Sequence, residues 1–553
     1  MMGGGIFRPL KYANSDDRIH VADILDSAEK VLKEDVVPCQ LERYSIVKAI
    51  AEDNIRHRIT IALTNGMFYS FNKSDNVFLS FSFADSDNNY IISSYINFCV
   101  GTNNLSALTP YVFDLSHLKA RFTTSPGCKV YVGNKEQVSG ISENDFSTGV
   151  DYRIIAQDGQ ENYYHITIRN TGLPIVFITT PENKEISSKS EWMGNVTIKV
   201  INNSGLIECC DSLMQIKGRG NSTWGYPKKP YSLKLNKKTE ILGMPKNKHW
   251  ILLANWLDRT LMRNEFAFEI ARITSLEWTP HGRFVELVLN GKHVGNYYLC
   301  EKITIDKNRV NISEMSKGDT VGLGLTGGYI VELDVNFDEQ NKFLSEYKNL
   351  PYMIKEPDEK KLQSAQLNYI QNYINCFERF LYSDNWLYNH DYIDYIDLKS
   401  FVDWWFVYEL SMNEEPFHPK SCYMYKDRGG KIKAGPVWDF DWGTFIPSRV
   451  NRYVAKDHIY YKRLFEDPEF NKMIKNRWAL LKPEFEKIPN KIRNKALLIR
   501  YSEKMNHLIW PVTFDVNGDA NFTFDKALNR MIEAYNSKLK WLDFQISFIN
   551  SSL

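Results

Sequence analysis

The stretch PVWDFDWGTF at residues 436–445 places two aspartates, Asp439 and Asp441, two positions apart in a run of apolar and aromatic residues. If this run is an extended strand, both carboxylates point to the same face, about 7 Å apart along the chain. Ionised carboxylates are costly to bury unless a partner compensates for their lost hydration. A Mg²⁺ ion, which prefers hard oxygen ligands together with substrate phosphates, is one such partner. A structural salt bridge is the other interpretation.

Further acidic residues precede this stretch. The residues DWWFVYELSM (403–412) predict a helix, and Pro416 prevents its simple continuation. Glu414 and Glu415 stand at the mouth of the loop that follows. Such a carboxylate can orient an attacking hydroxyl or accept its proton, so Glu414 and Glu415 are both candidates for that catalytic role.

A basic segment, KGRGNSTWGYPKKPYSLKL (217–235), is the candidate phosphate site. Glycines allow a close backbone approach, and the fork of Arg219 suits a phosphate. Lys229 and Lys234 follow, and Lys234 projects from a predicted strand, YSLKL. Glu301, on the second strand of a predicted hairpin, could pair with such a lysine, as an ion pair does in many kinases. A β-hairpin with a solvated charged face is the simpler interpretation of this segment taken alone.

Between these segments, WILLANWLDRTLMRNEFAFEIAR (250–272) predicts a strand followed by a helix. Asp258 is a plausible N-cap for that helix, which places Arg263 and Asn264 in its first turns. Helix capping with surface charge is at least as good an interpretation here as contact with a ligand.

The rest of the chain predicts three parts. Residues 1–75 are expected to be mostly helical, chiefly over 17–58, followed by two strands in RITIALTNGMFYSF (58–71). Residues 76–172 carry short alternating runs and regular turn signals, which indicate a small immunoglobulin-like β-sandwich. Residues 173–553 are strand-rich up to about 340 and mainly helical later. This segregated order predicts an α+β domain.

Composition excludes some classes of protein. The 68 basic and 67 acidic residues nearly cancel, which argues against a dedicated nucleic-acid-binding protein. No run of about 18 apolar residues predicts a transmembrane segment. The first residues, MMGGGIFRPL, lack the apolar core of a signal peptide.

Several long motifs, in order, resemble the spore coat protein H (CotH) kinase family. They are KGRGNSTW, KKPYSLKL, LGMPKNKHWILLANWLDRTLMRN, FVELVLNGKHVGNYYLCEKI and VWDFDWG, and the resemblance covers roughly residues 173–550. It implies an atypical protein-kinase-like fold that binds ATP and a divalent metal, Mg²⁺ or Mn²⁺. Asp439 falls where the family places its metal-binding aspartate, and Asp441 is a second candidate. Glu415 is the nearest acidic match to the family's catalytic aspartate, while Arg219, Lys229 and Lys234 match its basic segment.

Two hypotheses follow from the residues and the resemblance. The first is a kinase that phosphorylates Ser or Thr of an extracytoplasmic or surface protein. The second is a surface protein that binds a glycan or host protein on a kinase-like scaffold with little or no activity. The second is motivated by the β-domain, the 14% aromatic content and the glutamate at the catalytic position.

Overall fold

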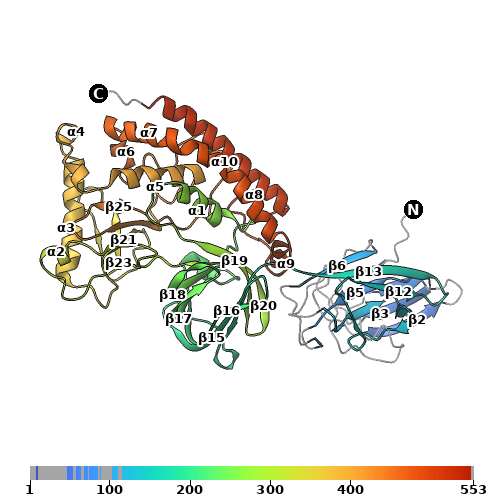
Figure 1. Cartoon of the computed structure of the whole chain (residues 1–553). Helices are drawn as coiled ribbons and strands as arrows, with labels where there is room; N and C mark the ends of the chain where they lie inside the picture. Colours follow the sequence, from blue (N-terminus) through green and yellow to red (C-terminus); the bar gives the residue numbers. More distant parts are fainter. Residues whose placement is uncertain are drawn as a thin grey trace. The chain divides into compact units, whose positions relative to one another are not determined.

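The computed structural model describes residues 8–9, 47–53, 58–63, 68–72, 74–84, 87–88, 103–109 and 115–549. Two compact units make up the chain (Figure 1). The first comprises residues Met1–Ile175 with Asn202–Leu206 and Val288–His293, and the second comprises the remainder.

Near the N-terminus the described residues form a four-stranded antiparallel sheet in the order β1-β4-β3-β2. Its strands are β1 (Arg8–Pro9), β2 (Val47–Asp53), β3 (Arg58–Leu63) and β4 (Phe68–Asn72). The pairing of β3 with β4 confirms the two predicted strands. The expectation of helix is wrong at β2, and the rest of its range up to residue 46 lies outside the described residues.

The next segment of the first unit is all β. A five-stranded sheet has the order β10-β9-β12-β13-β6, and β5 pairs with β8 while β7 pairs with β11. Phe78 and Phe81 of β5 share one hydrophobic core with Tyr152 of β12 and Ile166 of β13. The predicted hairpin around Asp158-Gly159 is confirmed by the antiparallel β12–β13 pair. Its immunoglobulin-like character stays a prediction. The bounds are β5 (Phe78–Ser82), β6 (Asn104–Thr109), β7 (Leu118–Lys119), β8 (Arg121–Thr124), β9 (Lys129–Val132), β10 (Lys135–Glu136), β11 (Glu143–Asn144), β12 (Val150–Ile155) and β13 (Glu161–Asn170).

Seven strands then close into a barrel in the order β14-β15-β16-β17-β18-β20-β19. Tyr231, Leu233 and Leu235 of β17 are buried, as the alternation of YSLKL predicts for one face. Asn290 and Gly291 both adopt positive φ at the turn between β19 and β20, which suits a tight hairpin. The bounds are β14 (Ile175–Thr179), β15 (Met193–Ile201), β16 (Ile207–Gly218), β17 (Tyr231–Ile241), β18 (Met244–Leu253), β19 (Gly282–Leu289) and β20 (Lys292–Glu301).

A second sheet of the same unit has the order β22-β23-β21-β24-β25 and lies against helices (Figure 1). Its strands are β21 (Tyr329–Leu333), β22 (Lys342–Leu344), β23 (Pro351–Glu356), β24 (Cys422–Lys426) and β25 (Ile432–Ala434). The helices are α1 (Arg263–Ile273), α2 (Gly322–Leu325), α3 (Ser364–Leu381), α4 (Trp386–Asn389), α5 (Leu398–Ser411), α6 (Tyr461–Leu464), α7 (Pro468–Phe485), α8 (Ile488–Ile499), α9 (Ser502–Ile509) and α10 (Phe524–Ser547). Strands therefore precede most helices, and the α+β prediction agrees with this content.

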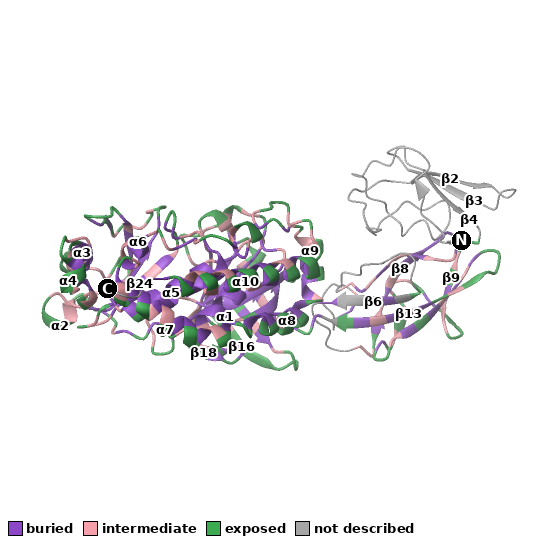
Figure 2. Cartoon of the chain, turned by 90° about the horizontal axis from the view of Figure 1, so that it is seen from above, coloured by how far each residue is buried: buried purple, intermediate pink, exposed green. Residues whose placement is uncertain are grey.

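Helix α5 is the centre of the helical layer. Every residue of α5 except Lys399 is buried, and Figure 2 shows the helix among other buried elements. A helix that is apolar on all sides is stable only when it is surrounded. Helix α5 contacts β25 on one side and α1, α7 and α10 on others. Its C-terminal end, at Met412 in the left-handed conformation, is thereby fixed where the acidic loop begins.

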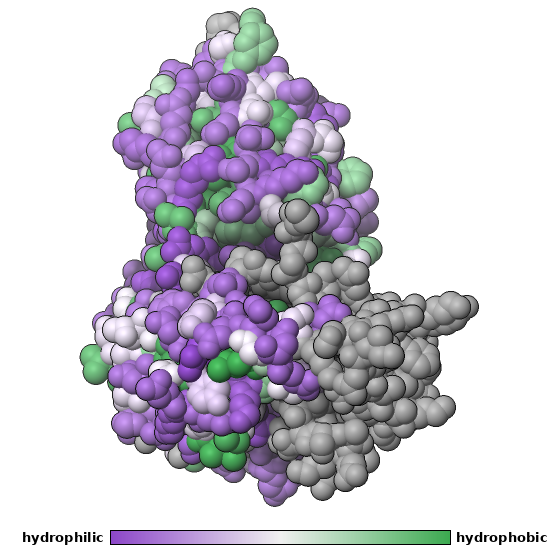
Figure 3. Space-filling model, turned by 90° about the vertical axis from the view of Figure 1, so that its right-hand side faces the viewer, coloured by the Kyte–Doolittle hydropathy of each residue, from purple (hydrophilic) through white to green (hydrophobic). Residues whose placement is uncertain are grey.

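The surface offers no membrane-spanning element within the described residues, because none of their helices combines the length and apolar character needed to cross a bilayer. The described part of the face in Figure 3 is mostly hydrophilic, with hydrophobic residues scattered singly or in small groups. Such scattered residues need no special explanation.

Candidate functional site

A cavity of about 460 Å³ lies in the second unit and is lined by both the barrel side and the five-stranded sheet. The barrel side supplies the Arg219–Thr223 loop and the residues after β18. The sheet supplies side chains of β21 and β23, and the segments around Glu415 and Asp439 complete the lining. The structure therefore brings together the basic loop and the acidic segments that the sequence singles out.

The two aspartates of the quoted stretch reach the cavity in an unexpected way. Residues 436–445 form irregular backbone rather than a strand, so the expected strand is wrong. Asp439 adopts the left-handed region with φ of 67°, which short polar side chains tolerate better than others. The side chains of Asp439 and Asp441 nevertheless line the same cavity and lie close enough to affect each other's pKa. Burial raises the pKa of Asp439, and burial together with Asp439 raises the pKa of Asp441 well above its usual range.

Glu415 lies beside this pair, while Glu414 does not. Glu415 lines the cavity, and its Oε2 atom is buried without a hydrogen-bond partner among the described residues. Burial and the charge of Asp439 raise the pKa of Glu415 to about 8. Glu414 instead forms ion pairs with Arg449, at 2.7 Å, and with Arg452. Of the two predicted acids, only Glu415 is placed to act in the cavity.

Four basic residues line the cavity: Arg219, Lys228, Lys355 and Lys420. The guanidinium of Arg219 lies over the ring of Trp438, 5.5 Å from its centroid, and its charge opposes the rise in the pKa of Asp439. Lys420 is exposed, and its charge likewise opposes the rise in the pKa of Glu415. Lys355 of β23 forms an ion pair with Glu332 of β21 at 3.2 Å. Both positive and negative charges therefore face the same space, as a bound phosphate and metal require.

The other three predicted residues lie outside the cavity lining. Lys229 donates to the Trp224 carbonyl at 2.8 Å, and Lys234 stands opposite His249 in the barrel ladder. Glu301 is fully buried and contacts His281 at 3.0 Å and Arg309 at 3.8 Å rather than Lys234. Glu301 therefore does not pair with Lys234 as expected, and at the cavity Lys355 pairs with both Glu332 and Glu339.

Sequence reasoning missed Lys355 and Glu332, and it left Asn264 open between helix capping and contact with a ligand. Glu332 is a lone acid in the apolar run YIVEL, and Lys355 is a lone base in PYMIKE. A charge inside an otherwise buried strand is unusual unless it is paired, and that is the signal that could have found them. Nothing local indicates that β21 and β23 are neighbours.

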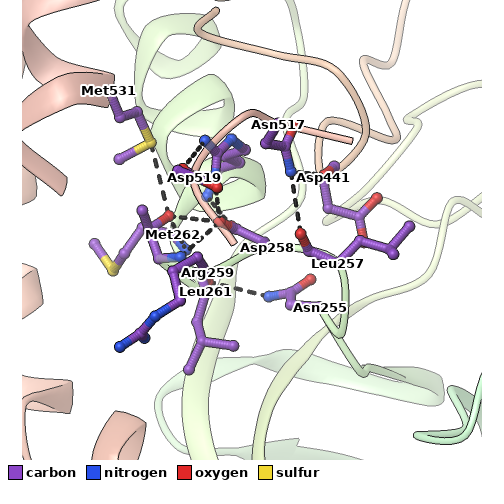
Figure 4. A network of polar contacts seen from close by, with 12 residues as sticks. Asn255, Leu257, Asp258, Arg259, Leu261, Met262, Asp441, Asn517, Asp519 and Met531 are labelled. Atoms are coloured by element: carbon purple, nitrogen blue, oxygen red, sulfur yellow. Dashed lines mark hydrogen bonds and ion pairs between the residues drawn. The ribbon is translucent and has the colours of Figure 1, made fainter. Parts of the chain in front are cut away.

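A buried ionic network fixes the start of α1, next to Asn264. Arg263, fully buried at the start of α1, forms ion pairs with Asp258 and, from Nη2, with Asp519 at 2.5 Å. Asp258 also accepts hydrogen bonds from Thr260 and from the Arg263 backbone N–H, as part of the cluster in Figure 4. Asp258 thus closes a turn before the helix and is not the N-cap that the sequence predicts, because α1 begins five residues later.

The donors suit a hard divalent cation bound together with phosphate. Asp439 and Asp441 supply carboxylate oxygens, and the unpartnered Oε2 of Glu415 is a further buried acceptor in the same cavity. Among the described residues, no group of three or more His, Cys, Asp or Glu side chains is arranged to hold a metal ion alone. Mg²⁺ commonly binds through one or two carboxylates, with substrate phosphates and water completing the shell, so the pair fits.

A family model described as CotH kinase protein matches residues 216–542, more than half of the 553 residues. The chain belongs to the CotH kinase protein family. The matched range contains Arg219, Glu415, Asp439 and Asp441, so the cavity lies within the CotH region.

Other comparisons add little. A search of curated proteins finds no match. A solved structure provisionally described as a glycoside hydrolase from Bacteroides thetaiotaomicron is 14% identical, covering 53% of this chain and 86% of that chain. The TM-score of 0.15 is too low to support any argument about fold or activity.

Proposed function

We propose that this CotH family member is a protein kinase that transfers phosphate from ATP, with Mg²⁺ or Mn²⁺, to a Ser or Thr hydroxyl of an extracytoplasmic or surface protein. The observation that carries the proposal is the cavity in which Asp439, Asp441, the cation Arg219 and Glu415 meet; among the described residues, Oε2 of Glu415 has no hydrogen-bond partner. Phosphoryl transfer depends mainly on positioning and electrostatic stabilisation, and these groups supply both signs of charge at one place.

Each residue has a distinct role in this proposal. Asp439 and Asp441 hold the metal ion, which when bound neutralises charge on the phosphates. Arg219 and Lys420 bind the phosphate oxygens, and Glu332 orients Lys355 toward them through their ion pair. The fork of an arginine suits two phosphate oxygens at once, whereas a lysine acts as a point charge.

Glu415 accepts the proton of the acceptor hydroxyl. Its Oε2 has no competing hydrogen bond among the described residues, so it is available to a hydroxyl that enters the cavity. A carboxylate raised in pKa by burial and like charge is a common feature of general bases. A glutamate reaches about one methylene further than the aspartate that the family resemblance leads us to expect.

Thermal unfolding with ATP tests the binding step. We expect ATP with Mg²⁺ to raise the melting temperature of the wild type, since a ligand at about 100 times its Kd adds about 2.7 kcal/mol of stability. Asp439→Asn should abolish the rise. Asp306→Asn is the matched control, because its carboxylate is 6% exposed and pairs with Lys238 outside the cavity lining.

The transfer step is tested by incubating the protein with labelled ATP and a casein-like acceptor and measuring the label transferred to protein. Transfer or autophosphorylation by the wild type and by Asp306→Asn, but not by Asp439→Asn, supports the kinase. If the wild type neither transfers phosphate nor responds to ATP, the proposal is wrong. The surface-adhesion hypothesis predicts that outcome, together with glycan or protein binding that persists in Asp439→Asn.

A further inference from the structure

The peptide unit between Asp439 and Phe440 is held on both of its edges by asparagines. Nδ2 of Asn413 donates to the Asp439 carbonyl at 2.9 Å. The Phe440 backbone N–H donates to Oδ1 of Asn264 at 2.8 Å. If this peptide unit were flipped, its N–H would face the Nδ2 donor of Asn413 and its carbonyl would face the Oδ1 acceptor of Asn264. The two amides therefore select one orientation, and with it the left-handed conformation of Asp439.

A third asparagine holds the next part of the loop. Nδ2 of Asn517 donates to the carbonyls of Asp441, at 3.0 Å, and Leu257, at 3.2 Å, and Figure 4 shows Asn517 beside both residues. Oδ1 of Asn517 accepts from the Gly443 N–H at 2.8 Å. One side chain thus fixes the backbone on either side of Trp442.

Each amide is fixed in its own orientation. The Leu261 carbonyl accepts from Nδ2 of Asn255, whose Oδ1 accepts from Nδ2 of Asn264, and this leaves Oδ1 of Asn264 for Phe440. Asn413 uses its Oδ1 for the Glu415 N–H, at 2.7 Å. It therefore links the backbone of the proposed base directly to that of the proposed metal ligand. Asn264, Asn413 and Asn517 are each at most 3% exposed.

We propose that Asn264, Asn413 and Asn517 are positioning residues that fix the separation of Glu415, Asp439 and Asp441 for metal and nucleotide binding. This inference rests on the proposed function. An amide is suited to the task because it carries a donor and an acceptor without charge, so it grips the backbone without competing for the metal. Groups that orient metal ligands typically change metal affinity about 10- to 100-fold when they are removed.

The test compares Asn413→Ser and Asn517→Ser with Asn375→Ser in the full chain. Asn375 is the matched control, because it is buried at 6% exposure and its Oδ1 accepts a backbone N–H, that of Glu346 at 3.2 Å, away from the cavity. Three quantities are measured: the melting temperature without ligand, the Mg²⁺ concentration that gives half of the ATP-dependent rise, and hydrogen exchange at residues 413–415 and 439–443.

We expect both site variants to need about 10- to 100-fold more Mg²⁺, with faster exchange at Glu415 in Asn413→Ser and at Gly443 in Asn517→Ser. Asn375→Ser should lower only the melting temperature. A folded site variant that keeps the wild-type Mg²⁺ midpoint overturns the inference, because the asparagines are then merely structural. If one site variant fails to fold, the other decides. If ATP with Mg²⁺ does not raise the melting temperature of the wild type, the proposed function fails. Hydrogen exchange tests the positioning role separately, because exchange rates in the site variants that equal those of the wild type overturn it.

Discussion

Glu414 and Glu415 are identical neighbours in sequence with opposite surroundings. Arg449 and Arg452 neutralise Glu414, whereas Glu415 faces Asp439 and Asp441 with a buried, unpartnered oxygen. The difference arises because Asn413 binds the Glu415 N–H and turns that residue inward after the end of α5. The two residues have the same side chain, and only their contacts in the folded protein distinguish them.

Glu415→Gln is expected to lower phosphate transfer by about 10²- to 10⁴-fold while the ATP-dependent rise in melting temperature persists. The amide keeps the size of the side chain but cannot accept the hydroxyl proton. Glu414→Gln is the control, and it should cost a little stability through its arginine pairs with transfer nearly unchanged. Steady-state transfer of labelled phosphate measures both variants. Equal losses in the two would contradict the assignment of Glu415.

Part of the site could be predicted residue by residue. Asp439, Asp441, Glu415 and Arg219 stand in short motifs whose chemistry is visible locally, and all four line the cavity. Lys234 lies outside the cavity lining, because a strand pattern predicts the face on which a side chain lies but not what that face contacts.

The residues that were missed share a different property. Glu332, Lys355 and Asn517 meet the site from segments far apart in the chain. Their role depends on which strands and loops are neighbours, and no local pattern contains that information.

At the scale of elements, the turn before α1 differs most from expectation. Capping rules place the helix start at Asp258, yet Asp258 accepts from Thr260 and Arg263 and the helix begins at Arg263. The reason is tertiary, because Arg263 also pairs with Asp519, 256 residues downstream. The acidic stretch at 436–445 likewise leaves the strand pattern, and side chains such as Asn264, Asn413 and Asn517, rather than a neighbouring strand, bind much of its backbone.

Arg263→Met is expected to lower the free energy of unfolding by about 3–5 kcal/mol, because it leaves Asp258 and Asp519 buried without their cation. Chemical denaturation followed by tryptophan fluorescence measures the change. Arg283→Met is the control at an exposed arginine and should stay within about 0.5 kcal/mol of wild type. A loss of less than 1 kcal/mol for Arg263→Met would show that the network adds little to stability.

For the whole molecule, the order of strand-rich and helical regions was predictable from residues 173–553, and the two β-regions before it were predictable in part. The helix expected over 17–58 fails at β2 because VKAIAED is short and its apolar spacing suits either structure. Pairing with the antiparallel strand β3 makes this segment a strand, and that pairing depends on tertiary structure rather than on the local sequence.

Acid sensitivity is expected from a network that ties α1 to β20 and α8. Burial alone would raise the pKa of Glu265, but the charges of Arg272 and Lys495 outweigh it and hold the pKa below the ordinary 4.5. A lowered carboxylate pKa contributes stability above pH 4.5, and this stability is lost as the pH falls through the folded value. Glu265→Gln should therefore destabilise the protein by about 3 kcal/mol at pH 7.

The same substitution should cost progressively less below pH 4.5, as protonation removes the charge from the wild type as well. Urea unfolding at pH 7 and at successively lower pH measures the difference. Glu277→Gln, at a half-exposed carboxylate paired with Lys433, is the control and should show little effect at any of these pH values. A difference that is independent of pH would contradict the ionic explanation.

Asn517 lies 76 residues downstream of Asp441, whose carbonyl it binds. When the ribosome has just added Asp439 and Asp441 to the nascent chain, it has therefore not yet added Asn517, whose side chain holds the Asp441 carbonyl. A nascent chain paused before residue 517 would expose the acidic loop without the side chain that holds its backbone, so the nucleotide binding proposed above would have to wait until translation of the domain is nearly finished.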